Sequence, residues 1–207
     1  VRADGFARAI HSIENAQFRT KFDPEIPRLR ADRGIGVISD TDDQPLLIRS
    51  HLGEYALATV GAIKNTDALV ASALRGKRLH FAEMSQGGIN PTELAAAFID
   101  QGDTFEEGIA ALQDAVEGSC SLLLLTRDGF YAARDRYGRT PIILGRKDGA
   151  WAATQETCAF PNLGFEPVRD LGPGEIVFIT ADGVEVRREP GPVDQTLGMP
   201  AATRPSR

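Results

Sequence analysis

Cysteine and histidine are scarce in this 207-residue chain, which has two cysteines and three histidines. His11, His51 and His80 stand alone, so no group of side chains has the spacing of a metal site. Cys120 and Cys158 lie in apolar segments far apart, and we expect two reduced, buried thiols. A disulfide is the alternative, but nothing else in the sequence indicates secretion. The sequence therefore predicts no metal and no cofactor.

Long apolar runs and an excess of positive charge are also missing. The longest apolar stretch lies around residues 122–125, far short of the about 20 residues that cross a membrane. The formal net charge of -6 disfavours binding to the phosphates of a nucleic acid. Hydrophobic content of 42% and charged content of 25% are ordinary for a soluble globular protein. We expect a soluble, cytoplasmic protein that binds neither nucleic acid nor membrane.

Neither end of the chain has the features of a complete domain. The sequence starts at Val1 without an initiator methionine or a signal peptide. After Pro190-Gly191-Pro192 it becomes rich in Pro, Ala and Arg, a composition that cannot offset the entropy cost of ordering. We interpret both ends as truncations. The prediction is one domain over 1–188 and a disordered tail over 189–207.

Short apolar and β-branched segments between Gly, Pro and Asp predict a series of strands. These strands are expected at 34–39, 45–49, 55–63, 119–126, 130–133, 141–146, 150–154 and 175–180. Asp-Gly pairs at 128–129, 148–149 and 182–183 are strong hairpin signals between consecutive antiparallel strands.

Three helices are predicted from their start signals. Asn65 is expected to cap a helix from about Thr66 to Leu74. The run from Asn90 to Glu93 forms a capping box with proline at the first helical position, which predicts a helix over 91–101. Thr104 opens a third helix over 105–117. Helices next to antiparallel hairpins indicate an α+β fold with helices packed on sheet.

The run from Tyr131 to Gly145 contains Ala-Arg-Asp-x-x-Gly-x-x-Pro and strongly resembles the amidotransferase-domain signature of the amidophosphoribosyltransferases. Glu156 to Phe160 and Leu171 to Ile176 resemble that family's Glu-Ser-Cys-Ala and Pro-Gly-Glu-Ile segments. Further landmarks fall in the family's order at 34–36, 44–45, 55–61 and 92–93, so the resemblance covers residues 34–180. Taken singly, the turn at 135–138 and the bend at 173–174 could equally be ordinary loops.

The resemblance implies an N-terminal-nucleophile hydrolase fold. That fold is a four-layer α/β/β/α sandwich of two antiparallel sheets, and we expect its N-terminal strand to be missing here. It also implies a glutamine amidotransferase-type domain of an amidophosphoribosyltransferase-like protein of purine nucleotide biosynthesis. In that family a C-terminal phosphoribosyltransferase domain joins ammonia to phosphoribosyl pyrophosphate. Such a domain in the intact protein and a homo-oligomer are the expected partners.

The side chains that this family uses on glutamine do not occur at the matching positions. The family's nucleophile is an N-terminal cysteine whose free α-amino group is its base, and Val1 has no nucleophilic atom. Cys120 and Cys158 lie inside the chain and cannot replace it. Ser39 matches the arginine that holds the α-carboxylate of glutamine, and the adjacent Asp40 would repel that carboxylate.

Two further positions depart from the family's pattern. Val60 matches the asparagine of the oxyanion hole, so only the backbone N–H of Gly61 remains to bind substrate. Pro91 matches the aspartate that the family presents to the α-ammonium of glutamine. We therefore assign no catalytic residue and predict an inactive glutaminase, a pseudoenzyme. If the alignment holds, Ser39, Val60, Gly61 and Pro91 should border one shared depression.

Two other functions stay open at this stage. One is a non-enzymatic regulatory or ligand-binding module on the same fold, for which Arg19, Arg49 and His51 are candidate binding residues. An exposed, solvated surface explains those three side chains about as well. The other is an N-terminal-nucleophile hydrolase of altered substrate, with its nucleophile upstream of Val1.

Overall fold

The computed structural model describes residues 1, 5–12, 14, 17–29, 31–39, 42–75, 84–85 and 88–192. Asp40, His80 and the part of the predicted tail from 193 to 207 lie outside these residues. Within the described tail, the backbone N–H of Gly191 donates to the carbonyl of Pro173 at 2.8 Å.

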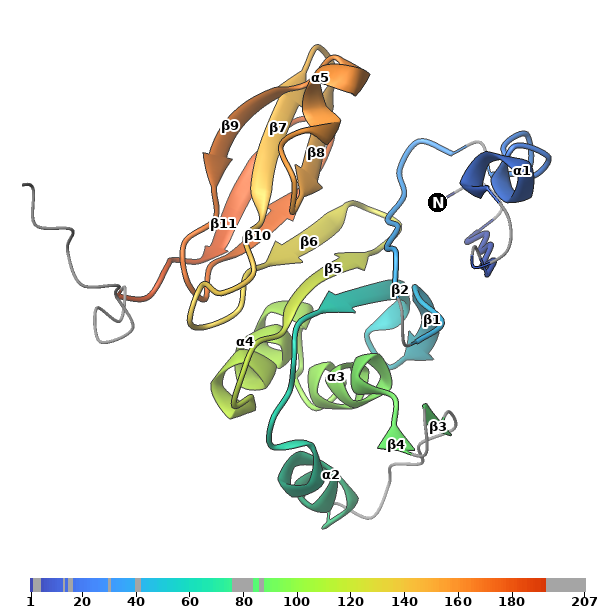
Figure 1. Ribbon diagram of the computed structural model, residues 1–207. Helices are drawn as coiled ribbons and strands as arrows, with labels where there is room; N and C mark the ends of the chain where they lie inside the picture. Colours follow the sequence, from blue (N-terminus) through green and yellow to red (C-terminus); the bar gives the residue numbers. More distant parts are fainter. Residues whose placement is uncertain are drawn as a thin grey trace, which may run out of the picture.

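The larger sheet is antiparallel and has six strands in the order β1-β2-β5-β6-β10-β11 (Figure 1). Its strands are β1 (Leu46–Ser50), β2 (Gly53–Val60), β5 (Ser121–Leu125), β6 (Phe130–Ala133), β10 (Ile176–Ile179) and β11 (Val184–Arg188). The predicted Asp-Gly turns join β5 to β6 and β10 to β11. In these turns Thr126 N donates to Gly129 O and Thr180 N to Gly183 O, each at 2.9 Å. A short separate hairpin pairs β3 (Met84–Ser85) with β4 (Gly88–Ile89).

The smaller sheet is also antiparallel and has three strands in the order β8-β7-β9. Its strands are β7 (Ile143–Lys147), β8 (Ala150–Thr154) and β9 (Glu166–Asp170). The third predicted Asp-Gly turn, at 148–149, joins β7 to β8. The prediction of two antiparallel sheets is therefore confirmed.

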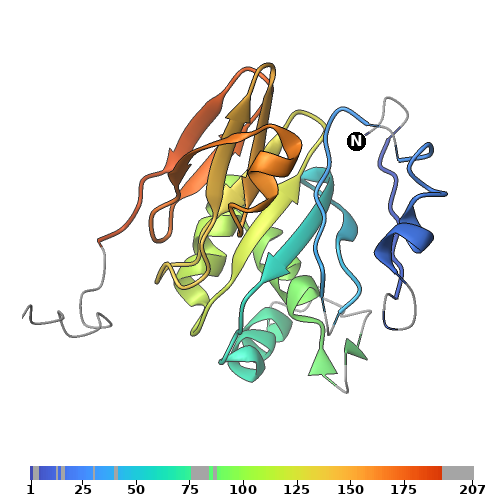
Figure 2. The same cartoon turned by 45° about the horizontal axis from the view of Figure 1, so that its top comes forward.

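Two helices, α3 (Pro91–Ile99) and α4 (Phe105–Ala115), cover the face of the larger sheet that points away from the smaller one (Figure 2). A third helix, α2 (Thr66–Arg75), packs against α3. The predicted caps of α3 and α4 are confirmed: Asn90 Oδ1 accepts from Thr92 N at 2.8 Å, and Thr104 Oγ1 accepts from Glu107 N at 3.2 Å. Two short helices, α1 (Phe18–Phe22) and α5 (Ala159–Leu163), complete the described elements.

The side chain of Asn65 bonds to the end of α4 and not, as predicted, to the first turn of α2. Its Oδ1 accepts from Glu117 N and its Nδ2 donates to Ala115 O, both at 2.9 Å. The carboxamide thus ties the start of α2 to the end of α4, because these two backbone groups lie within its reach.

Two apolar cores define the layers. The first lies between the three helices and the larger sheet, with Leu57, Leu94 and Leu112 among its fully buried side chains. The second lies between the two sheets and contains Leu144 and Val177.

A small outer layer covers the other face of the smaller sheet. Phe160 of α5 packs over Gly145 of β7, where an added Cβ would lie 2.6 Å from its ring. Gly145 faces away from Leu144, because neighbouring residues of a strand point to opposite faces. The order of layers is therefore helices, sheet, sheet and the short helix α5, as the resemblance implies.

The prediction of a strand over residues 34–39 is wrong, because the structure has no strand there. Gly34 and Gly36 have no side chain to pack, which weakens a strand, and Ile38 is 74% exposed. None of the described helices is long and apolar enough to cross a membrane.

Candidate functional site

The signature turn after β6 is organised around the carboxylate of Asp135, which is 2% exposed. Asp135 Oδ1 accepts from the backbone N–H groups of Tyr137 and Arg139, each at 3.1 Å, and Oδ2 accepts from Thr140 N at 2.8 Å. Ser121 Oγ on β5 also donates to Oδ2, at 3.3 Å. The buried carboxylate of Asp135 therefore holds the whole turn in place. An ordinary solvent-exposed loop has no such buried acceptor.

The signature turn is directly bonded to the Pro-Gly-Glu segment. Arg134 N donates to Glu175 O at 3.1 Å, and Gly174 N donates to Asp135 O at 3.0 Å. The Arg134 guanidinium also donates to Gly138 O at 2.6 Å, which closes the turn from the other side. Two landmarks that are far apart in the sequence thus form one structural unit.

Glu175 holds the smaller sheet against the larger one. Its side chain is 3% exposed and forms a paired contact with Arg169 of β9, with N–O distances of 2.6 and 3.0 Å. Glu175 Oε2 also accepts from Gly172 N at 2.7 Å. Hydrogen bonding to Glu175 raises the pKa of Arg169. The family landmarks around Asp135 and Glu175 are therefore scaffold.

The end of β2 lies against the start of α3. Thr59 Oγ1 and Thr92 Oγ1 are 2.6 Å apart and both residues are buried. Gln44 Oε1 accepts from Thr59 N at 2.8 Å, so a third segment joins the same corner. Val60 follows Thr59 and Pro91 precedes Thr92, so each of these two predicted positions is one residue away from the contact. The side chain of Val60 points to the opposite face of β2 from that of Thr59.

Gly61 occupies a backbone conformation that favours glycine, with φ of 143°. A Cβ at this position would lie 2.3 Å from the carbonyl oxygen of Ser119. Ser119 N donates to Ala62 O at 2.9 Å, and its Oγ accepts from Ala62 N at 3.1 Å. The close approach to Ser119 therefore requires glycine whether or not its N–H binds a substrate.

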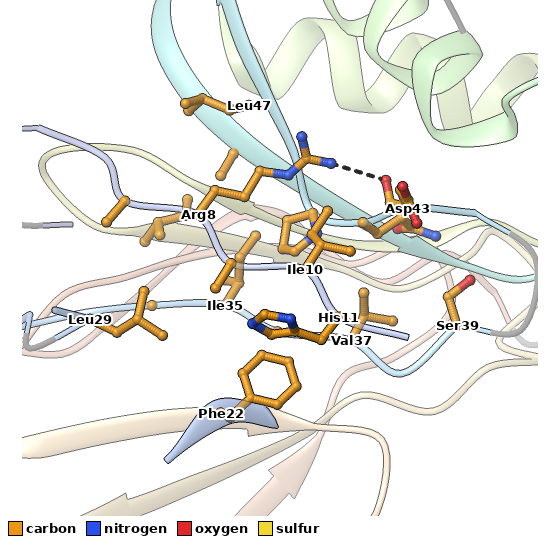
Figure 3. Close-up of a pocket in the computed structure, with 18 of the residues that line it drawn as sticks. Arg8, Ile10, His11, Phe22, Leu29, Ile35, Val37, Ser39, Asp43 and Leu47 are labelled. Carbon is orange, nitrogen blue, oxygen red and sulfur yellow. Dashed lines mark hydrogen bonds between the residues drawn. The ribbon is translucent and has the colours of Figure 1, made fainter. Parts of the chain in front are cut away.

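Ser39 lies at a cavity of about 950 Å³ on the inner face of the larger sheet (Figure 3). Leu47, Ala56 and Leu125 contribute from the sheet, and the opposite wall comes from residues 6–12, α1 and residues 33–39. Val60, Gly61 and Pro91 are not among the lining residues. The depression that all four predicted positions should share is therefore not this cavity.

The cavity walls combine apolar side chains with several polar and charged ones. The His11 ring meets the edge of Phe22 at 4.9 Å between ring centroids, and His11 Nε2 lies 3.0 Å from Glu25 Oε1. Arg8 spans one side and donates to Asp43 O at 3.3 Å (Figure 3). A cavity of this size and character suits a mostly apolar small molecule.

The residues proposed for a rival binding site do not line this cavity. The exposed Arg49 pairs with Glu54, which also accepts from Arg127 at 2.9 Å. His51 Nε2 lies 3.0 Å from the carbonyl oxygen of Gly102. Arg19 is on α1 but does not line the cavity.

The two thiols lie in different environments. Cys120 is buried as predicted, and burial raises the pKa of its thiol to about 12, with a further contribution from the Asp135 carboxylate. Cys158 is exposed, which corrects the prediction, because it lies at the surface end of α5 and contacts Glu156 at 3.4 Å. Across the residues that the structure describes, no three His, Cys, Asp or Glu side chains form a group able to hold a metal ion.

Comparison with known proteins places this geometry among glutamine amidotransferases. The family described as "Glutamine amidotransferase domain" matches residues 28–161. The amidophosphoribosyltransferase of Mycobacterium tuberculosis is 34% identical over 153 residues, which cover 72% of this chain and 29% of that protein. The Staphylococcus aureus enzyme is 28% identical over 186 residues, covering 77% of this chain and 38% of the enzyme.

Solved structures agree with the sequence matches. The glutamine phosphoribosylpyrophosphate amidotransferase from B. subtilis, complexed with ADP and GMP, superposes with a TM-score of 0.62. It is 28% identical, and the match covers 70% of this chain and 31% of that one. The chain thus spans only about a third of the length of these relatives.

Proposed function

We propose that this chain, which belongs to the class-II glutamine amidotransferase domains of the amidophosphoribosyltransferase family, does not hydrolyse glutamine. Two sets of residues differ in what has happened to them. Those that hold the fold together are present, and those that would act on glutamine have been replaced.

The observation that carries the proposal is Val60 beside Gly61 at the end of β2. Hydrolysis of glutamine passes through a tetrahedral oxyanion, and the family's asparagine donates a side-chain hydrogen bond to it. Valine has no donor, so one of the two expected donors is lost. Removing one oxyanion donor of this kind typically costs about 10²–10³ in turnover.

Recognition of the amino-acid end of glutamine is weakened as well. Ser39 in place of arginine offers a hydroxyl where a guanidinium would make two charge-assisted bonds to the carboxylate. Pro91 in place of aspartate removes the carboxylate that the family presents to the α-ammonium of glutamine, and Glu93 is the acidic residue in the first turn of α3. None of these three substitutions depends on which residue begins the chain.

The intact protein is a second part of the proposal. The relatives that this chain matches are amidophosphoribosyltransferases more than twice its length. We infer a cytoplasmic protein of purine biosynthesis in which a phosphoribosyltransferase domain accompanies this one. That protein would use free ammonia, or would have lost the transferase activity too.

The test is glutamate release by the purified protein incubated with glutamine. A matched variant, Val1→Cys with a free α-amino group, supplies the nucleophile and its base. We expect neither protein to exceed a heat-inactivated control, because Val60, Ser39 and Pro91 remain. Release by either protein that is abolished by a thiol-directed glutamine analogue would contradict the proposal.

A ligand-binding module is the second candidate, and the cavity of about 950 Å³ favours it. Filling the cavity by Ile35→Trp should abolish the rise in melting temperature that a bound small molecule causes. Val168→Trp on the exposed strand β9 is the control, since it adds the same ring outside the cavity. A rise retained in Ile35→Trp would place the ligand elsewhere.

A further inference from the structure

The signature turn carries more positive than negative charge. Its six residues, 134–139, include three arginines and one aspartate. The carboxylate of that aspartate, Asp135, is buried, where three backbone N–H groups and a hydroxyl donate to it. Arg136 and Arg139, in contrast, are exposed. The positive charge of the turn therefore faces solvent, and its negative charge does not.

The surroundings of the turn do not cancel this charge. Glu175, in the bonded Pro-Gly-Glu segment, is already paired with Arg169. On the neighbouring loop Lys64 N donates to Glu117 O at 2.7 Å, so these two exposed residues, one of each sign, lie together. The turn thus remains a cationic spot on a chain whose formal net charge is -6.

The guanidiniums of the turn pair with no carboxylate among the residues that the structure describes. Arg134 donates to two backbone carbonyl oxygens, and Arg139 Nη1 donates to Gly118 O at 2.9 Å. A carbonyl oxygen orients a guanidinium, but its partial charge does not neutralise the cation. The Arg136 side chain forms no hydrogen bond within the described residues, so its N–H groups are open to a ligand.

One aromatic ring holds Arg136 and Arg139 together. Their Cζ atoms lie 5.8 and 4.8 Å from the centre of the Tyr137 ring. A cation–π contact uses the flat face of a guanidinium and leaves its edge, which carries the N–H donors, to other partners. Beside Arg136 and Tyr137 is a surface depression of about 10 Å³ that Ser119 also lines. Ser119 Oγ accepts from Ala62 N, which leaves the hydroxyl hydrogen to donate.

We propose that Arg136 and Arg139 bind the phosphate group of a small molecule, either inorganic phosphate or a phosphomonoester. Two guanidiniums match the two negative charges of phosphate, and the edge of each offers two parallel N–H groups to its oxygens. A carboxylate would balance only one of the two guanidiniums. The Ser119 hydroxyl adds a neutral donor at the edge of the same depression.

The fold keeps these donors in place before a ligand binds. Asp135 Oδ1 accepts from the backbone N–H groups of Tyr137 and Arg139, which fixes where both side chains leave the backbone. A preorganised site loses less entropy when it binds. The depression has room for only about one water, so the phosphate stays at the surface. We expect a Kd on the order of 1 mM that rises with salt.

NMR titration with inorganic phosphate tests the site, at constant ionic strength and about pH 8, where phosphate is mainly a dianion. The backbone N–H signals of the signature turn should shift and saturate. A parallel titration with glycerol 3-phosphate distinguishes the two sources of phosphate. Tighter binding of glycerol 3-phosphate assigns the site to a phosphomonoester, and equal binding assigns it to the phosphate group alone. The site uses none of the positions aligned with the glutamine site, so the result does not depend on the proposed loss of glutaminase activity.

Two matched variants test the role of the turn. Arg136→Gln should raise the Kd by about tenfold, because it removes charge-assisted hydrogen bonds to the ligand. Arg146→Gln is the control, since Arg146 is also exposed and its Cζ lies 5.4 Å from the centre of the Trp151 ring, but on the smaller sheet. It should leave the Kd unchanged. No saturable shift at the turn with either probe, or an equal rise of the Kd in both variants, would overturn the proposal.

Discussion

Replacing Asp135 by alanine should destabilise the fold strongly. The change removes the acceptor of three backbone N–H groups, at 2.8 to 3.1 Å, and of the Ser121 hydroxyl. Hydrogen bonds to a charged group contribute about 1.5–3 kcal/mol each, but these are not additive. Arg139 is exposed, so its backbone N–H can form a hydrogen bond to water when the carboxylate is removed. We therefore expect a loss of about 3–4 kcal/mol in the free energy of unfolding.

Urea denaturation followed by circular dichroism measures this loss directly. Asp182→Ala is the matched control, because Asp182 is an exposed aspartate in another hairpin turn. Asp135→Asn should fall between the two: its oxygen can still accept from Tyr137 and Arg139, but its NH₂ group then faces the N–H of Thr140. If Asp135→Ala and Asp182→Ala unfold at the same urea concentration, Asp135 does not organise the turn as described.

Three other predictions concern Gly61 and the cysteines. Gly61→Ala should lower the melting temperature by several degrees, because its Cβ would lie 2.3 Å from Ser119 O, whereas Gly183→Ala meets open space and should not. A thiol reagent should label Cys158 alone in the folded protein and both cysteines in urea; labelling of Cys120 without urea would contradict its burial. Because burial raises the pKa of Cys120 from 9.0 to about 12, its contribution to stability is complete below pH 9 and is lost as pH rises towards 12. Urea midpoints at pH 8 and 10.5 should therefore differ less in Cys120→Ala than in the unaltered chain.

Much of the fold could be predicted from local signals. The Asp-Gly pairs located three hairpins, and the caps at Asn90 and Thr104 located two helices, because these signals act within a few residues. The strand β9 was missed, and β11 was predicted only as the second arm of the hairpin at 182–183, without bounds. The residues of β9 are all exposed and mostly charged, so β9 lacks the apolar alternation that marks a strand with one buried face. In β11 only Val184 and Val186 alternate with charged residues, which is a short signal. Tertiary pairing, with β7 and with β10, makes them strands.

The candidate site was less accessible to sequence analysis. The aligned positions identified which side chains differ from the family, but not where they lie. The Thr59–Thr92 contact lies one residue away from both Val60 and Pro91, while Ser39 lines a cavity that includes neither of them. Much of the wall of that cavity comes from residues 6–12 and 33–39, which have no periodic pattern, so no local signal could have predicted it. The scaffold roles of Asp135 and Glu175 likewise depend on partners far away in the sequence.

Glutamine binding tests the central claim most directly, because binding needs no nucleophile and so does not involve the first residue of the chain. Isothermal titration of glutamine into the purified protein should show no saturable heat at millimolar concentrations. The expectation follows from the loss of both charged partners, at Ser39 and Pro91, for the amino-acid end of glutamine. Saturable binding with a micromolar Kd, weakened by Ser39→Glu, would show that the glutamine site is intact and would contradict the account.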